Sequence, residues 1–185
     1  MRRTTTAQRT TWSPTSDIVN MIQDTLVALD WDGKTALPYL AKSWTISPDG
    51  KLYTFKLRDD VSFCSGKKFT ADDVVYSFKR LKDPETRAPL AWRAGNIKEL
   101  RAPDPYTVEY ELAEPFSELL LQLTMFTNAI HNKESVEALG KDYGIKGVDG
   151  TGPWCFVSWQ PRTEIVLKRH DAYRWGPSMY QNKGR

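Results

Sequence analysis

Adjacent carboxylates and isolated histidines are the side chains of this sequence that are best suited to proton transfer. Asp59-Asp60 and Asp72-Asp73 are neighbours in the chain, and neighbouring residues on a helix or strand point in different directions. Asp72-Asp73 also has a sufficient structural role at the start of a helix. His131 and His170 lie in no dyad context, and no Gly-x-Ser-x-Gly elbow is present. We therefore predict no catalytic residues and no enzymatic activity.

The two cysteines, Cys64 and Cys155, lie far apart and form no Cys-x-x-Cys motif. His131 and His170 are distant from both in the chain, so the local sequence offers no set of convergent metal ligands. We predict no metal site and no cofactor. In an exported protein the cysteines could form one disulfide, and two buried free thiols are an equally good interpretation.

A glycine-rich stretch at 147–154, GVDGTGPW, has the composition of a phosphate-binding loop. It lacks the Gly-Lys-Ser/Thr ending that brings a lysine to the phosphates. Pro153 also removes a backbone donor where a phosphate would need one. The stretch is better explained as a turn that lets chain segments pack closely before a strand.

Length and charge further limit the classes of function that the protein can have. The 185 residues suffice for one compact domain, and 26 basic residues nearly balance 23 acidic ones. The basic residues are scattered along the chain, whereas a nucleic-acid binder would cluster them, so we predict no nucleic-acid partner. No stretch approaches the roughly 20 apolar residues of a membrane span, and no intact signal peptide is present. The protein is either cytosolic or exported by a signal that this sequence lacks.

Hydrophobic periodicity and turn residues predict an α+β fold with β-hairpins and single packed helices. Asp49-Gly50 between alternating strands predicts a hairpin, and Thr70 before Asp72-Asp73 predicts a helix N-terminus. The predicted helices cover 17–32 (capped by Asp17), 70–83, 115–123 and 133–139, and the predicted strands cover 44–46, 52–57, 106–112, 154–159 and 163–168.

An ordered set of motifs runs through nearly the whole chain. They are DTLVALDWDG at 24–33, PYLAKSW at 38–44, SPDGKLYTFKLR at 47–58, VSFCSGKKFTADDVVYSF at 61–78, GTGPW at 150–154 and LKRHDAYRWG at 167–176. Taken in this order, the motifs resemble those of the peptide- and nickel-type (family 5) extracellular solute-binding proteins of ABC transporters.

The resemblance implies a mixed sheet that forms part of lobe I of a periplasmic-binding-protein-like fold (type II, cluster C). It implies a polar N-terminal loop at 1–16, a small subdomain of the first lobe at 17–145, and a segment at 146–185 that returns into the first-lobe sheet. Family chains are much longer, so we expect a first-lobe fragment that presents half a cleft and holds ligand weakly. A stand-alone interaction domain that kept this fold is the alternative.

Proteins of this family are periplasmic or extracellular, and some are membrane-anchored. The resemblance therefore implies a monomer that binds a peptide or small molecule and docks on an ABC permease. By position alone, the implied ligand-binding residues are Trp12, Ser13, Trp92, Met125, Thr127 and Asn128. The segment 125–128 lacks the arginine that nickel-uptake members place there, which favours peptides, opines or sugars over an anionic metal chelate. We assign Trp44 and Trp154 to the core.

Overall fold

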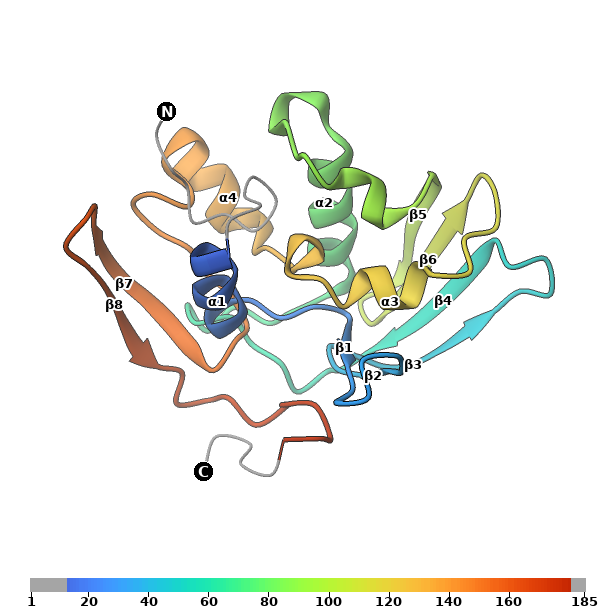
Figure 1. The fold of residues 1–185 in the computed structure, drawn as a ribbon, viewed down its shortest axis with the longest axis horizontal. Helices are drawn as coiled ribbons and strands as arrows, with labels where there is room; N and C mark the ends of the chain where they lie inside the picture. Colours follow the sequence, from blue (N-terminus) through green and yellow to red (C-terminus); the bar gives the residue numbers. More distant parts are fainter. Residues whose placement is uncertain (1–12, 181–185) are drawn as a thin grey trace.

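A computed structural model describes residues 13–180 of the chain. A four-stranded antiparallel sheet lies at one end of the molecule and a separate β-hairpin at the other, with helices between them (Figure 1). The helices are α1 (Ser13–Ile22), α2 (Ala71–Lys82), α3 (Leu119–Leu123) and α4 (Lys133–Leu139), with short 3₁₀ helices η2 (Pro84–Thr86), η3 (Ala91–Ala94), η4 (Phe126–Asn128) and η5 (Gly140–Asp142). The strands are β1 (Val27–Leu29), β2 (Ala36–Pro38), β3 (Ala41–Ile46), β4 (Leu52–Leu57), β5 (Ile97–Asp104), β6 (Thr107–Leu112), β7 (Trp154–Gln160) and β8 (Glu164–Arg169). Within this described part, no helix is long and apolar enough to span a membrane.

The main sheet has the strand order β3-β4-β6-β5, and the predicted hairpin forms its β3–β4 pair. Gly50 in the connecting turn has φ +69°, a left-handed conformation that glycine adopts without strain. Tyr53, Phe55 and Leu57 point into the core, as their alternation predicts. Strand β5 was not predicted from the sequence, because its charged residues mask the alternation on the side of the sheet that faces water.

Helix α2 covers the inner face of this sheet and begins where the sequence predicts. The Thr70 backbone N–H donates to Asp73 Oδ2 at 3.1 Å, which completes a capping box. Phe78 then packs edge-on against Tyr110 of β6, with ring centroids 5.2 Å apart. The helix ends at Asp83 before Pro84, also as predicted.

The first predicted helix is wrong at both ends. Helix α1 starts at Ser13, so residues 13–16 are not the predicted loop and Asp17 is not an N-cap. It stops at Ile22, whose carbonyl oxygen accepts a hydrogen bond from the Gly152 N–H at 2.8 Å. This bond comes from the glycine-rich stretch far along the chain, so no local signal announces the helix end. The chain then runs extended into β1, and Met21 and Leu29 are exposed rather than part of a buried stripe.

Of the two tryptophans that we assigned to the core, Trp154 lies outside it and Trp44 packs against its edge. Trp154 is 43% exposed, because β7 and β8 form a two-stranded sheet with one face in water, and Cys155 is the only fully buried residue of β7. Trp44 is half-buried at the edge of the core, with its ring centroid 6.4 Å from that of Phe55.

A buried carboxylate, Asp24, ties together four segments of the chain. Its Oδ2 accepts hydrogen bonds from Thr151 Oγ1 at 3.0 Å and from Trp175 Nε1 at 3.2 Å. Its Oδ1 accepts a short hydrogen bond from the Tyr39 hydroxyl, which also lies 3.1 Å from the Tyr173 hydroxyl. Burial raises the pKa of Asp24 to about 6, although these hydrogen bonds oppose the rise.

We expect Asp24 to make stability depend on pH. Its folded-state pKa lies above the unfolded value of 3.8, so its contribution is complete below that value and is lost as the pH rises through about 6. The loss amounts to about 3 kcal/mol of unfolding free energy. Denaturant unfolding of the wild type and of Asp24→Asn at about pH 4 and about pH 7 measures it. A wild-type-minus-variant difference that is equal at the two pH values would contradict this assignment.

Candidate ligand-binding surface

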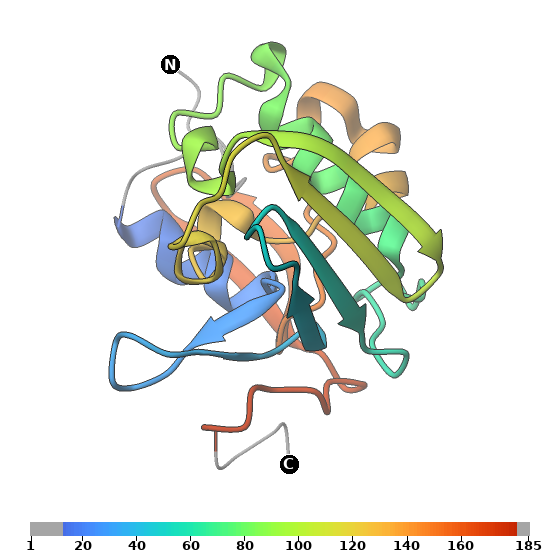
Figure 2. The same cartoon turned by 90° about the vertical axis from the view of Figure 1, so that its right-hand side faces the viewer.

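The segments that carry the predicted ligand residues come together in the fold. Helix α1 contacts η4, η4 contacts η3, and η3 contacts α3. These elements lie next to one another in both views of the ribbon (Figure 1; Figure 2). Trp12 lies outside the described residues, and so does the side chain of Ser13, although the Ser13 backbone begins α1. We call the surface formed by η3 and η4 the η3–η4 surface.

Trp92 in η3 presents its ring to solvent with 57% of the residue exposed. The Arg93 guanidinium lies 4.9 Å from the centre of that ring, which is cation–π distance. Arg93 Nη1 also donates to Gln122 Oε1 at 2.7 Å, so this pair joins η3 to the end of α3. Gly95, with φ +71°, ends η3 against Leu112, where an added Cβ would lie only 3.1 Å from Leu112 Cδ2.

The η4 residues offer polar atoms rather than apolar area. Thr127 and Asn128 are buried, and Met125 just before them is half-buried. Asn128 Nδ2 donates to the Gln122 carbonyl at 2.8 Å. Among the described residues, Thr127 Oγ1, Asn128 Oδ1 and Arg93 Nε are buried without a hydrogen-bond partner. Buried polar atoms normally find partners, and these three belong to η3 and η4, two short helices that contact each other.

Arg93 is the residue that the sequence analysis missed at this surface. The segment 125–128 contains no arginine, but η4 within it contacts η3, the helix that contains Arg93. The argument against an anionic ligand therefore holds for that segment and not for the surface as a whole. The only sequence signal was its position next to Trp92.

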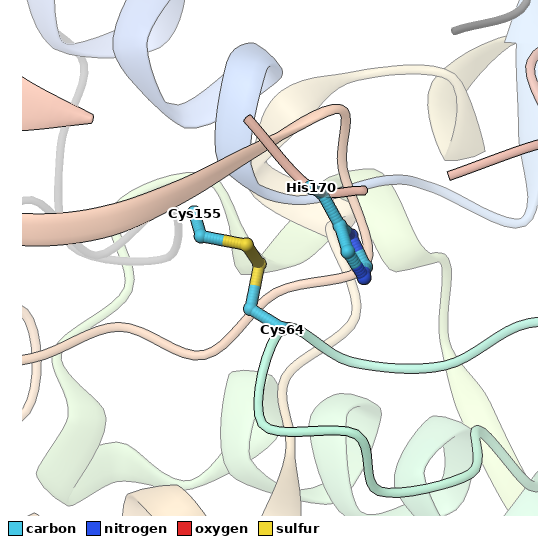
Figure 3. Close-up of side chains that lie close together, drawn as sticks. All are labelled: Cys64, Cys155 and His170. Carbon is cyan, nitrogen blue, oxygen red and sulfur yellow. A yellow bond between two sulfur atoms is a disulfide. The ribbon is translucent and has the colours of Figure 1, made fainter. Parts of the chain in front are cut away.

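The cysteines are joined by a disulfide between Cys64 and Cys155, with their Cα atoms 5.7 Å apart. The interpretation as a disulfide is therefore confirmed, and the interpretation as two free thiols is wrong. His170, distant in the chain, lies beside the bond (Figure 3). The bond fastens the loop before α2 to strand β7.

Asp60, Asp73 and His131, which we considered for proton transfer, each make contacts that stabilise the fold. Asp73 is buried and pairs with Lys67 Nζ at 2.7 Å, and Asp60 pairs with Arg58 at 2.5 Å. His131 is fully buried, with Nδ1 2.9 Å from Gln23 Nε2. Burial, with a smaller effect of the nearby Arg80 charge, holds the pKa of His131 well below its usual range, so the ring stays neutral.

The family model for bacterial extracellular solute-binding proteins, family 5 Middle, matches residues 35–184. The chain belongs to this family. It is similar to the glutathione-binding protein GsiB of Escherichia coli, with 34% identity over 140 residues that cover 76% of this chain and 27% of that protein. It is also similar to the nickel-binding periplasmic protein of Escherichia coli, with 31% identity over 164 residues that cover 85% of this chain and 30% of that protein.

A solved structure described as the substrate-binding domain of an oligopeptide ABC transporter from Bacillus anthracis has a similar fold. It superposes with a TM-score of 0.84 at 30% identity, over 92% of this family 5 chain and 36% of that structure. The fold is therefore the predicted one, a mixed α and β arrangement that matches part of a family 5 binding protein. The chain spans about a third of the length of these relatives.

Proposed function

We propose that this chain supplies one side of the binding site of a solute-binding protein that serves an ABC importer of peptides or similar small solutes. The observation that carries the proposal is the η3–η4 surface, where Trp92 of η3 is exposed and the two contacting helices contain, among the described residues, three buried polar atoms without partners. An aromatic face with a few convergent polar groups is the usual composition of a small-ligand site. Binding without turnover is the proposed role.

Peptide chemistry suits this surface. The Trp92 ring offers a flat apolar area for a side chain, and Thr127 Oγ1 can donate to a peptide carbonyl. Asn128 Oδ1 can accept from a peptide N–H, and Arg93 Nε can donate to a carbonyl or carboxylate. The relatives are described as binding glutathione and nickel, and a third belongs to a transporter that is named for oligopeptides, so a peptide ligand is in keeping with two of the three.

We also propose a compartment, an oligomeric state and a membrane partner for the protein. The Cys64–Cys155 disulfide supports an oxidising compartment, such as the periplasm or the cell exterior. There the protein would act as a monomer and deliver solute to its membrane permease. Residues 17–145 would form the small subdomain of the first lobe and 146–185 its return segment. A surface that contacts only one side of a ligand binds weakly, because its fewer contacts offset less of the entropy that is lost on association.

We expect di- to pentapeptides to bind the 185-residue chain with roughly millimolar Kd. Titration of the ¹⁵N-labelled chain should shift the indole N–H resonance of Trp92 and the backbone resonances of Thr127 and Asn128. Trp31 and Trp154 are exposed tryptophans outside this surface and serve as internal controls. Their indole resonances should not move.

The matched variants are Trp92→Ala and Trp154→Ala, which each remove one exposed tryptophan. Only Trp92→Ala should abolish the peptide-induced shifts at Thr127 and Asn128. Shifts that persist in Trp92→Ala, or that centre on Trp154, would rule out the η3–η4 surface. Micromolar affinity would contradict one-sided binding. No shift anywhere with any peptide would favour the stand-alone interaction domain.

A further inference from the structure

The disulfide and His170 form a compact cluster of metal-ligating side chains. One ligand atom from each of Cys64, Cys155 and His170 lies within 4.8 Å of the other two. They come from the loop before α2, from β7 and from the residue that follows β8. Figure 3 shows the imidazole beside the sulfur atoms. Nothing in the solute-binding role requires a histidine at this place.

The imidazole is fixed in one tautomer when neutral. His170 Nδ1 lies 2.9 Å from the Gly152 carbonyl oxygen, which can only accept, so Nδ1 carries the proton. Nε2 then carries the lone pair that a metal ion needs. A backbone carbonyl that holds the opposite ring nitrogen is the usual support of a metal-ligating histidine. The ring also packs edge-on against Trp175, with centroids 5.4 Å apart.

A surface cavity borders the two cysteines. Its volume is about 530 Å³, and both Cys64 and Cys155 line it. Cys64 is half-buried, whereas Cys155 and His170 are buried. The cavity and the half-buried Cys64 place the approach of a small reductant, and then of a cation, on the Cys64 side.

We propose that reduction of this disulfide creates a Cys₂His site for one thiophilic cation of the Zn²⁺ type. A dithiol reduces the bond by exchange: it becomes a cyclic disulfide, and Cys64 and Cys155 become thiols. Each thiol releases one proton as its thiolate binds the cation, His170 supplies the third ligand, and water from the cavity fills the fourth position. Ligand atoms of a tetrahedral site lie about 3.5–4 Å apart, so shifts of roughly 1–2 Å complete it.

The test uses Cd²⁺, which reports thiolate binding through an ultraviolet charge-transfer band. The chain is reduced with a phosphine, which leaves the reaction as phosphine oxide, and is desalted without oxygen. We expect one Cd²⁺ per chain and a midpoint of thermal unfolding that rises by roughly 5–10 °C at free Cd²⁺ about 100-fold above its Kd. His170→Gln keeps both thiols and should bind at least about 10-fold more weakly. The Cys64→Ser/Cys155→Ser double variant should show no band.

Three outcomes would overturn the proposal. The first is equal Cd²⁺ affinity in the reduced wild type and in His170→Gln, which would mean that the thiols alone bind the ion. The second is a midpoint that falls on adding Cd²⁺, because ions that bind only unfolded thiols destabilise the fold. The third applies if reduction itself disrupts the fold: Cd²⁺ must then restore the near-ultraviolet circular dichroism of the oxidised chain, and failure to do so rejects the site.

Discussion

Replacing Gly150 by alanine is expected to lower the free energy of unfolding by about 3–5 kcal/mol. An added Cβ at this position would lie 2.0 Å from the carbonyl oxygen of Ile22, so the backbone itself has to move. That movement weakens two hydrogen bonds, from Cys64 N–H to the Gly150 carbonyl at 2.9 Å and from Gly152 N–H to the Ile22 carbonyl at 2.8 Å. Denaturant unfolding followed by far-ultraviolet circular dichroism measures the loss.

Gly147 in the same loop provides the control. An added Cβ there would meet only the end of the Leu139 side chain, at 2.9 Å, and that side chain can rotate away. Gly147→Ala should therefore cost less than about 1 kcal/mol. Equal costs for the two variants would show that the loop adapts and that its glycines are not needed for the close approach to α1.

Loss of the disulfide is expected to have an effect of similar size. The bond closes a loop between residues 91 apart in the chain, and the chain-entropy model gives a stabilisation of about 4–5 kcal/mol. The Cys64→Ser/Cys155→Ser variant should lose this amount in denaturant unfolding with a chelator present. Its denaturant dependence (m-value) should also rise, since the unfolded chain without the cross-link exposes more surface.

Two comparisons make this result interpretable. The wild type should show no reactive thiols before reduction and two after it. The reduced wild type should then match the double serine variant within about 1 kcal/mol, because both lack the same cross-link. A reduced protein as stable as the oxidised one would mean that the packing of β7 against α1 holds the hairpin without the bond.

Much of the secondary structure could be predicted from the sequence, because its signals are local. The Asp49-Gly50 turn between alternating strands, the Thr70 cap and the Gly140 at the end of α4 each act within a few residues of the element they delimit. The order of the motifs along the chain also predicted the family that the comparisons show. The close packing of the glycine-rich stretch was predicted as well, although its partner was not.

Only the tertiary structure decided how distant segments meet. The end of α1 at Ile22 coincides with a hydrogen bond from Gly152, and the helix that contains Arg93 lies against Thr127 and Asn128 of η4 only through the contact of η3 with η4. The Cys64–Cys155 bond and the donors around Asp24 likewise bridge long stretches of chain. Such contacts form because burial and hydrogen bonding in the whole fold outweigh the local preference of each segment for helix or strand. No pattern of neighbouring residues predicts them. The sequence by itself therefore determined the family and most elements, while the fold decided what surrounds Trp92 and which side chains lie beside the cysteines.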